Sequence, residues 1–397
     1  MKRETLTAGE FSIASRLLRK GPLANIELST SLGLSASTVS LLLKKLIEKR
    51  LITEIQAEHY LKPTEESQRR RKTFAVNPEL GYALTAEIDY DHIVFSRVNF
   101  DLSPVSSRRV PTRGNDRTSI FDQIHDEITN ELKRGDDQCL GIGFSLPGHV
   151  DVQSLTSIRN TRMKNWQDVS FAGFEKFCST VIMENLANAK AAGEYAAGFG
   201  RELDDFLFLN VDNGTGMGIF IHGELYRGSR FTAGEAGHVI VNEESENICT
   251  CGNRGCLESY VSNKSVHTQL LRLKTSDVDS GLFDDPDFDS IERAYPLLAR
   301  HYAAGDKVAY LTVNEIAHHM GLACASFLHL FAPEKIIIGG AVTELGEGFI
   351  GLVVNCMRRY HLPWQGPINL SFPADNRHVG AQGLAYQVFL KHLGGTV

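Results

Sequence analysis

The sequence predicts a multidomain protein in which a small N-terminal α+β domain precedes a larger α/β body. Residues 1–80 combine two short helical patterns with two short strands, whereas strands alternate with helices from Leu80 onward. Charge divides the chain at the same place. Residues 1–80 carry 14 Lys and Arg against 9 Asp and Glu, and the remainder has a balance of −12. A basic head on an acidic body indicates that only the head meets a polyanion.

Composition indicates an ordinary globular protein of two or three domains. Of 397 residues, 42% are hydrophobic and 22% charged. The first twenty residues lack the apolar core of a signal peptide, and no stretch approaches the roughly 18 apolar residues of a membrane span. Four of the seven cysteines are scattered without a framework: Cys139, Cys178, Cys324 and Cys356. We therefore expect a reduced, cytoplasmic protein without membrane insertion.

The head carries the pattern of a helix-turn-helix. A helical pattern over residues 23–32 is followed by Gly33 and by a second helix from Ser35, a good N-cap, to about residue 50. The core positions expected on the second helix are Val39, Leu43, Leu46 and Ile47. The positions expected on its opposite face are Ser37, Thr38, Leu41, Lys44 and Lys45. Small hydroxyl residues followed by lysines suit a helix that reads the major groove and touches phosphates.

A strand pair completes the head. Residues 51–55 and 74–76 are typical of two strands, joined by a polar tip that includes Arg69, Arg70 and Arg71. A β-hairpin with arginines at its tip can enter a minor groove. Alone, the basic run is more often a solvated loop, and the helix pair fits any small helical subdomain. Together, in this order, they predict a winged helix-turn-helix domain over residues 1–78 that binds double-stranded DNA.

The body shows six candidate strands, at residues 83–88, 93–99, 140–145, 206–211, 218–221 and 336–338. The first two are close enough to form a hairpin, so we expect a mixed sheet. A linker is expected near Asn77 and Pro78, because proline disfavours helix in the residue before it. Residues 277–289 hold six aspartates and one proline, which predicts a surface excursion.

Four potential metal ligands fall within 19 residues, in the spacing His-x10-Cys-x-Cys-x4-Cys: His238, Cys249, Cys251 and Cys256. Three thiolates and one imidazole make a complete tetrahedral ligand set for Zn²⁺. Gly252 and Gly255 lie inside the loop, where tight turns around a metal require positive φ. Because the set leaves no position open for an activated water, the sequence predicts a structural zinc site and not a catalytic one.

Two carboxylates are tied to the same loop. Glu235 precedes His238 by three residues, and Glu258 follows Cys256 by two. Paired acceptors fixed by a metal loop suit the hydroxyls of a sugar. The glycine-rich turn at residues 212–218, which includes Asn213, follows a strand and could present backbone N–H groups to an anion. A tight connection between adjacent strands explains that turn equally well.

With these motifs the chain resembles the ROK family, which unites sugar kinases with sugar-responsive repressors, and it resembles the repressor branch over nearly its whole length. The zinc signature runs from Gly237-His238 to Cys249-Thr250-Cys251-Gly252-Asn253-Arg254-Gly255-Cys256-Leu257-Glu258. The other shared elements are Ser145-Leu146-Pro147-Gly148, Glu184-Asn185-Leu186-Ala187-Asn188-Ala189, Ala304-Gly305-Asp306 and Ile336-Ile337-Ile338-Gly339-Gly340.

The resemblance implies a two-lobed α/β body of the actin/hexokinase (ribonuclease H-like) type. Its first lobe would span residues 79–186, completed by about 378–397, and its second lobe residues 187–377, with the zinc loop and a dimerisation surface. It also implies a set of effector contacts. The contacts that it implies are Asn185, Glu235, His238 and Glu258. We add Gly148 and Asn213, which lie in the two glycine-containing turns at residues 145–148 and 212–218.

Two departures from the family pattern argue against phosphotransfer. ROK kinases carry an aspartate general base after the asparagine of the Glu-Asn pair, where this chain has Leu186. Losing a positioned base costs on the order of 10²–10⁴ in rate. The phosphate turn at residues 88–92 reads Ile-Asp-Tyr-Asp-His, without glycine. We therefore expect no enzyme activity and no ATP. Leu186 also predicts a less hydroxylated or modified sugar as effector, a weakly bound one, or a vestigial pocket.

These observations predict a sugar-responsive transcriptional regulator, expected to repress genes of carbohydrate uptake or catabolism. It would bind its operator as a homodimer or a dimer of dimers and leave it when a sugar binds. Two alternatives remain open at this point. One is a sugar or amino-sugar kinase with an appended DNA-binding head, and the other is a regulator controlled by a protein partner.

Overall fold

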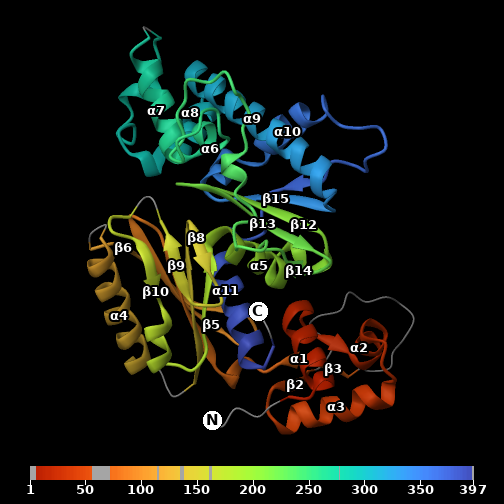
Figure 1. Ribbon diagram of the computed structural model, residues 1–397. Helices are drawn as coiled ribbons and strands as arrows, with labels where there is room; N and C mark the ends of the chain where they lie inside the picture. Colours follow the sequence, from red (N-terminus) through yellow and green to blue (C-terminus); the bar gives the residue numbers. More distant parts are fainter. Residues whose placement is uncertain are drawn as a thin grey trace. The chain divides into compact units, whose positions relative to one another are not determined.

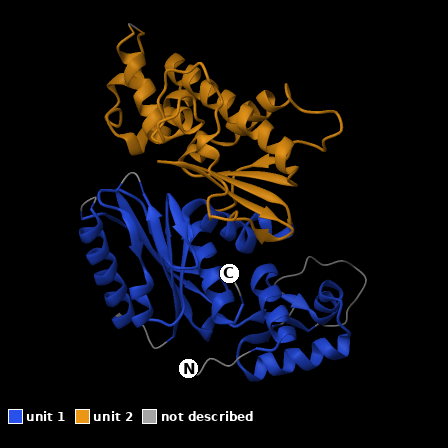
Figure 2. Cartoon of the chain, in the orientation of Figure 1, with its two compact units in different colours: residues 1–202, 377–397 blue, residues 203–376 orange. Residues whose placement is uncertain are grey.

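A computed structural model describes residues 6–55, 72–113, 116–134, 138–160, 163–276 and 278–395. Arg69, Arg70 and Arg71 lie outside the described residues. The chain divides into two compact units, coloured separately in Figure 2. The first contains Met1–Glu202 and Arg377–Val397, and the second contains Leu203–Asn376. The carboxyl-terminal segment therefore completes the first unit.

The described residues of the head form helices α1 to α3 (Figure 1) and a sheet of order β1-β3-β2. The helices are α1 (Ala8–Lys20), α2 (Asn25–Leu32) and α3 (Ala36–Glu48). The strands are β1 (Leu23–Ala24), β2 (Ile52–Ile55) and β3 (Thr73–Val76). The strand β3 pairs antiparallel with both neighbours. The helix pair and the strand pair lie where the sequence predicts them.

The first helix of the head, α1, was not predicted, although it begins with a capping box. The Thr7 hydroxyl accepts a hydrogen bond from the backbone N–H of Glu10 at 3.3 Å, and the Glu10 carboxylate accepts one from the N–H of Thr7 at 2.8 Å. The pattern Thr-x-x-Glu before an apolar run is the signal that could have found it. Its apolar face buries Ile13, Ala14 and Leu17 in the head.

The helix α3 begins as predicted, because Ser35 accepts a hydrogen bond from the N–H of Thr38 at 3.1 Å. Three of its four predicted core positions are buried: Val39, Leu43 and Leu46. The fourth prediction is wrong, since Ile47 is 39% exposed. Ile47 lies about 100° around the helix from Leu46, at the edge of the stripe that the other three fill.

The body of the first unit is built on a mixed five-stranded sheet of order β11-β7-β4-β5-β6. Its strands are β4 (Tyr82–Ile88), β5 (His92–Asn99), β6 (Pro104–Pro111), β7 (Cys139–Leu146) and β11 (Val181–Asn185). A smaller sheet contains β8 (His149–Asp151), β9 (Thr156–Arg159) and β10 (Gln167–Ser170). The helices are α4 (Arg117–Arg134), α5 (Leu186–Ala197) and α11 (Val379–His392). The predicted hairpin is β4–β5.

Close packing of α5 against α11 places α5 in the first unit. A Cβ atom on Gly193 of α5 would lie 1.8 Å from the carbonyl oxygen of Val379, and one on Gly383 of α11 would lie 1.8 Å from that of Ala189. Glycines at both positions let the two backbones touch. The change of unit therefore falls between Glu202 and Leu203 and not after residue 186.

The second unit has a five-stranded sheet of order β14-β13-β12-β15-β16. Its strands are β12 (Phe206–Val211), β13 (Thr215–Ile221), β14 (Glu224–Leu225), β15 (Lys335–Gly339) and β16 (Leu370–Ser371). Its helices are α6 (Glu258–Val261), α7 (Asn263–Lys274), α8 (Ala294–Ala303), α9 (Lys307–Phe331) and α10 (Glu347–Met357). Within the described ranges, no single helix is long and apolar enough to cross a bilayer, and only α2 and α3 taken together, across a 113° bend, pass by length and composition.

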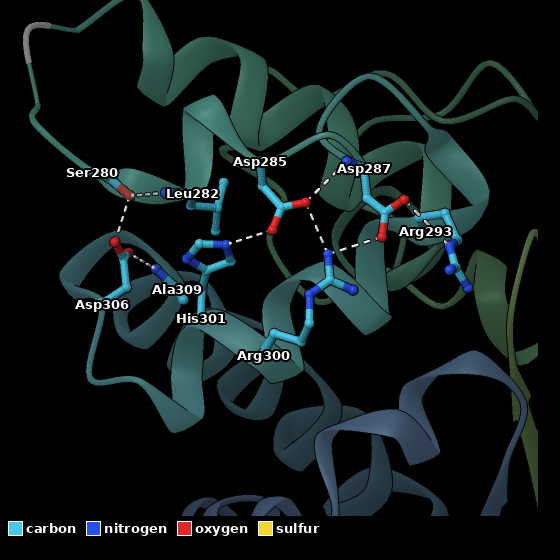
Figure 3. A network of polar contacts seen from close by, with 9 residues as sticks. All are labelled: Ser280, Leu282, Asp285, Asp287, Arg293, Arg300, His301, Asp306 and Ala309. Carbon is cyan, nitrogen blue, oxygen red and sulfur yellow. Dashed lines mark hydrogen bonds and ion pairs between the residues drawn. The ribbon is translucent and has the colours of Figure 1, made fainter.

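The aspartate-rich stretch, predicted to be a surface excursion, is anchored to the second unit by buried side chains and by hydrogen bonds to helices. From residue 278 onward, Leu282 and Phe288 are buried in the core of the second unit. Asp285 accepts a hydrogen bond from Arg300 of α8 at 2.9 Å (Figure 3). Ser280 donates one to Asp306, the N-cap of α9, at 2.6 Å. The segment is thus joined to α8 through Asp285 and to α9 through Ser280.

Candidate metal centre, effector residues and DNA-binding surface

The predicted metal ligands converge in the second unit. The ligand atoms of His238, Cys249, Cys251 and Cys256 all lie within 4.8 Å of one another. His238 ends a short 3-10 helix, and the cysteines follow on a loop tied back by isolated bridges between Ile240 and Cys256 and between Ile248 and Arg254. Cys249 and Cys256 are buried, whereas Cys251 is exposed.

The spacing of these atoms fits a tetrahedral zinc ion. Zn–S bonds of about 2.3 Å and Zn–N bonds of about 2.0–2.1 Å imply sulfur–sulfur edges of about 3.8 Å and nitrogen–sulfur edges of about 3.6 Å. The Sγ atoms of Cys251 and Cys256 are 3.7 Å apart, and Nδ1 of His238 is 3.5 Å from Sγ of Cys249. The donor set and its geometry therefore suit Zn²⁺, and these four residues would provide all four ligands of a tetrahedral site.

The two loop glycines adopt the predicted backbone. Gly252 has φ +94° and Gly255 has φ +70°. A Cβ atom on Gly255 would lie 1.7 Å from the carbonyl oxygen of Asn242, so this position also requires close backbone approach. Burial alone would raise the pKa of Cys249, but hydrogen bonds, chiefly with His238, bring that pKa down to about 6. The thiolate, which is the metal-ligating form, is favoured there.

The two carboxylates beside the loop differ in exposure and partners. Glu235 is exposed, and its carboxylate lies 3.9 Å from Nε2 of His238, the nitrogen opposite the one that faces Cys249. Glu258 is buried at the start of α6. It accepts hydrogen bonds from the backbone N–H of Thr215 at 3.0 Å and from the Thr250 hydroxyl at 2.9 Å. Glu258 thus links the metal loop to strand β13.

Asn213 belongs to the tight turn between β12 and β13, where Val211 pairs with Thr215. The side chain of Asn213 is buried and accepts a hydrogen bond from Asn263 at 3.0 Å. The glycine-rich turn is therefore a tight connection between two adjacent strands, one of the two explanations that the sequence allows. Asn213 lies in the middle of this turn, and Glu258 is bonded to Thr215, the residue with which the turn ends.

In the first unit, Asn185 and Gly148 contact each other. The side-chain amide of Asn185 donates to the carbonyl oxygen of Gly148 at 3.0 Å. Its oxygen accepts from the N–H of Ala187 at 2.8 Å, which makes Asn185 the N-cap of α5. Gly148 has φ +93°, and a Cβ atom there would lie 2.4 Å from the carbonyl oxygen of Arg159. Both residues are held in place by the backbone around them.

The two positions that separate this chain from the kinase pattern also lie in the first unit. Leu186 is the first residue of α5, directly after its N-cap. The turn from β4 to β5 closes with a hydrogen bond from the N–H of Asp89 to the carbonyl oxygen of His92 at 2.8 Å. Asp91 and His92 are paired within it at 2.7 Å. Carboxylates in such a turn repel phosphate charge.

The predicted DNA-reading residues share the exposed face of α3. All five are exposed, including Leu41 at 57%: Ser37, Thr38, Leu41, Lys44 and Lys45. Their spacing places them opposite the buried stripe of this helix. The hydroxyls of Ser37 and Thr38 lie 2.9 and 2.8 Å from that of Ser35 at the helix start. The helix thus presents two hydroxyls at its start and two lysines behind them.

Sequence reasoning missed two polar partners around Glu258 and Asn213. Thr250 lies between two cysteine ligands of the signature, and its hydroxyl binds Glu258. Asn263, the first residue of α7, donates to both Asp212 and Asn213. The position of Thr250 within the signature is a signal that could have identified it. Nothing in the sequence links Asn263 to residues 50 positions away.

Comparison with known proteins supports this architecture. The xylose repressor of Caldicellulosiruptor bescii is 29% identical over 336 residues, which cover 83% of this chain and 82% of that protein. The DNA-binding transcriptional dual regulator NagC of Escherichia coli is 26% identical over 349 residues, which cover 85% and 81%. Both alignments extend well beyond the head into the body.

Solved structures agree on the fold. A ROK family transcriptional regulator, a homolog of the Escherichia coli MLC protein, superimposes with a TM-score of 0.79 over 97% of both chains at 21% identity. A ROK family glucokinase from Streptomyces griseus, solved with glucose and AMPPNP, has a TM-score of 0.68 at 26% identity and covers 77% of this chain and 98% of its own. The predicted actin/hexokinase-like α/β body is confirmed.

The family match itself covers most of the chain. Residues 86–386 match the ROK family, and residues 11–53 match the winged helix-turn-helix DNA-binding family. The family includes kinases as well as regulators. The chain belongs to the ROK family and joins its body to a winged helix-turn-helix domain.

Proposed function

We propose that this protein is a sugar-responsive, DNA-binding transcriptional repressor of carbohydrate genes. The observation that carries the proposal is the exposed face of α3, with Ser37, Thr38 and two lysines, on a head joined to a ROK body. Its relatives named xylose repressor and NagC regulator align with 83% and 85% of this chain. The face of α3 would lie in the major groove, with its lysines near phosphates.

We further propose that His238, Cys249, Cys251 and Cys256 hold a structural Zn²⁺. The edge lengths of 3.5 and 3.7 Å support this assignment. When bound, the ion supplies a rigid link between the segment that bears Glu235 and the start of α6. Glu235 would then orient His238 through Nε2, as carboxylates do beside metal-bound imidazoles.

The carboxylates of Glu235 and Glu258, with His238 and Asn213, are the effector contacts that we propose in the second unit. Their connection to one loop supports the assignment, because sugar hydroxyls need acceptors whose positions do not change. Asn185 and Gly148 remain the predicted contacts of the first unit. Leu186 beside Asn185 offers an apolar surface in place of a carboxylate, which favours a sugar with fewer hydroxyls or a modified one.

Leu186 and the Asp89–Asp91 turn support the view that the protein is not a kinase and binds no ATP. A leucine cannot accept the proton of a sugar hydroxyl. The carboxylates of the turn are already engaged, Asp91 with His92 at 2.7 Å and Asp89 with the N–H of Tyr90 at 2.8 Å. A coupled ADP-release assay over a sugar panel tests this point. Turnover near 1–100 per second, usual for kinases, would contradict it.

The regulator would act as a homodimer or a dimer of dimers on an approximately palindromic operator. A two-fold assembly presents two α3 helices to half-sites about one helical turn, or a multiple of it, apart. Sedimentation measurements on the full chain and footprinting on bound DNA would give the number of protomers and the half-site spacing. A monomer that protects a single half-site would contradict this part of the proposal.

The main test is selection of sheared genomic DNA by the full-length protein, followed by gel shifts on the enriched fragments. Titration with D-xylose, N-acetyl-D-glucosamine, D-glucose and their phosphates should find a ligand that weakens binding at least tenfold, about 1.4 kcal/mol. Glu258→Gln should keep operator binding but lose that response. Absence of any fragment preferred over bulk competitor would refute DNA-directed function. If no sugar releases the protein from its operator, effector control is refuted but DNA binding is not.

A further inference from the structure

Two cysteines outside the metal centre lie against each other at one end of the first-unit sheet. Cys139 is the first residue of β7, and Cys178 lies three residues before β11, the neighbouring parallel strand. The paired residues nearest to them are Ile142 and Val181, each three positions further along its strand. Continued for three more residues, that register would place Cys178 opposite Cys139.

The contacts around the pair show that the two segments stay close before β11 begins. The N–H of Ile142 donates to the carbonyl oxygen of Thr180 at 2.9 Å, and a Cβ atom on Gly141 would lie 2.8 Å from the same oxygen. The Sγ atom of Cys178 lies 3.7 Å from the carbonyl oxygen of Cys139, and the Sγ atom of Cys139 lies 3.5 Å from the carbonyl oxygen of Gly141. Opposed residues of adjacent strands lie within the Cα separation that a disulfide requires, about 4.4–6.8 Å.

The two thiols have unequal acidity. The hydrogen bond from Cys139 is the main reason that the pKa of Cys178 falls to about 6, whereas the same interaction and burial raise the pKa of Cys139 well above its usual range. Cys178 would therefore be the thiolate and Cys139 the thiol near neutral pH. Both side chains are half-buried, so small oxidants have access. This combination is typical of an attacking cysteine next to a resolving one.

We propose that Cys139 and Cys178 form a reversible disulfide when the protein meets a hydroperoxide. This would be an oxidative modification site separate from the metal centre, and it does not depend on the repressor function. The bond would covalently join β7 to the segment that leads into β11. Because β11 ends at Asn185, the N-cap of α5, the cross-link would stiffen the strand that carries a predicted effector residue.

The chemistry balances with hydrogen peroxide as the two-electron oxidant. The Cys178 thiolate attacks one peroxide oxygen, the O–O bond breaks, and the departing hydroxide takes up a proton to leave as water. Cys178 is then a sulfenic acid. The Cys139 sulfur attacks the Cys178 sulfur, its proton is transferred, and the S–O bond breaks to release a second water. Two thiols and one peroxide thus give one disulfide and two waters.

The experiment uses zinc-loaded, full-length protein treated with hydrogen peroxide, followed by differential alkylation and peptide mass spectrometry. Zinc release is followed in parallel with a chromogenic chelator. We expect a linked Cys139–Cys178 peptide that is lost on adding dithiothreitol and forms at least tenfold faster than zinc is released. Cys324, fully buried in the second unit, should stay reduced and serves as an internal reference. In Cys139→Ser the link should vanish and Cys178 should become trappable by dimedone as a sulfenic acid.

Three results would overturn the proposal. One is oxidation confined to the zinc ligands, and another is conversion of Cys178 to a sulfinic acid without any linked peptide in the wild-type protein. The third is linkage that appears only after unfolding in urea. Because the linked peptide is measured in the wild-type protein, a poorly folding variant would not affect the outcome.

Discussion

Asp285 shows what a single carboxylate contributes to the aspartate-rich segment. It accepts hydrogen bonds from the N–H of Asp287 at 2.9 Å, from Arg300 at 2.9 Å and from His301 at 3.0 Å (Figure 3). These hydrogen bonds, of which the one from Asp287 has the largest effect, lower the pKa of Asp285 from 3.8 to about 2. Since the folded pKa lies below the unfolded one, the ionised carboxylate stabilises the fold above about pH 4. That stabilisation is lost as the pH falls toward 2.

Asp285→Asn should therefore lower the thermal unfolding midpoint at pH 7, and the gap to the wild type should narrow below about pH 4. The amide keeps an acceptor but loses the charge that attracts Arg300. Asp289→Asn, an exposed position in the same segment, is the matched control and should change little. Differential scanning fluorimetry between pH 7 and pH 3 would measure both. A gap that stays constant down to pH 3 would contradict the assignment.

The metal loop supports a second prediction at the scale of the residue. Cys251→Ala should reduce bound zinc from about one ion per chain to nearly none, because three ligands hold the ion far less tightly than four. Proteolysis should then cut the loop between His238 and Cys256 more readily. Elemental analysis after dialysis measures the first effect. Cys178→Ser, a cysteine outside the loop, should keep its zinc, and equal zinc loss in both variants would contradict the site.

Among the elements, the crossing of α5 and α11 depends on glycine. A side chain at Gly193 would meet the carbonyl carbon and oxygen of Val379, which belong to the backbone and cannot rotate away. The far end of α5 also contacts the head. The guanidinium of Arg19 in α1 lies 3.7 Å from the centre of the Tyr195 ring, and Arg201 donates to the carbonyl oxygen of Arg19 at 2.7 Å. One helix therefore contacts α11 and the DNA-binding head.

Gly193→Ala should destabilise the first unit by about 1–3 kcal/mol or more, because the two helices must separate. For a unit of this size that lowers the unfolding midpoint by on the order of 5 °C. Gly351→Ala in α10 is the matched control: it is also a helical glycine, but a Cβ atom there meets nothing within 4 Å. It should be neutral or stabilising by about 0.4–1 kcal/mol. Equal effects of the two changes in calorimetry would refute the packing argument.

Across the whole molecule, charge distinguishes the head from the body. The chain has a net charge of −7, yet its first 80 residues are positive. Because the head attracts DNA and the body repels it, we expect only a few phosphate contacts. The loss of any one of them should then measurably reduce the slope of log K against log salt. The lysines of α3 are exposed on the predicted DNA-reading face and are the candidates for these contacts.

Lys44→Ala should weaken binding to all sequences and reduce the slope of log K against log salt by about 0.9, the value for one phosphate contact. Lys133→Ala removes the same charge from an exposed position on α4 and serves as the matched control. Fluorescence anisotropy at several salt concentrations gives both slopes. An unchanged slope for Lys44→Ala, or an equal change for Lys133→Ala, would show that α3 does not carry the phosphate contact.

Much of the fold and of the metal centre could be predicted because the signals are local. The spacing of His238 and the three cysteines, the N-cap at Ser35 and the strand at Phe206–Val211 each depend on neighbours along the chain. Ile47 was misplaced because the width of a buried stripe depends on what packs against it. The role of Asn263 was missed because its partners, Asp212 and Asn213, are distant in sequence.

By itself the sequence determined the order of domains, the candidate metal ligands and the face of α3 that points away from the core. These follow from periodicity and spacing, which are properties of consecutive residues. The family followed from the resemblance of its motifs. Only the tertiary structure decided that α5 belongs with the C-terminal helix, that Glu258 joins the metal loop to β13, and that Cys139 meets Cys178. Each of these contacts joins segments whose separation along the chain carries no local signal, and close packing alone brings them together.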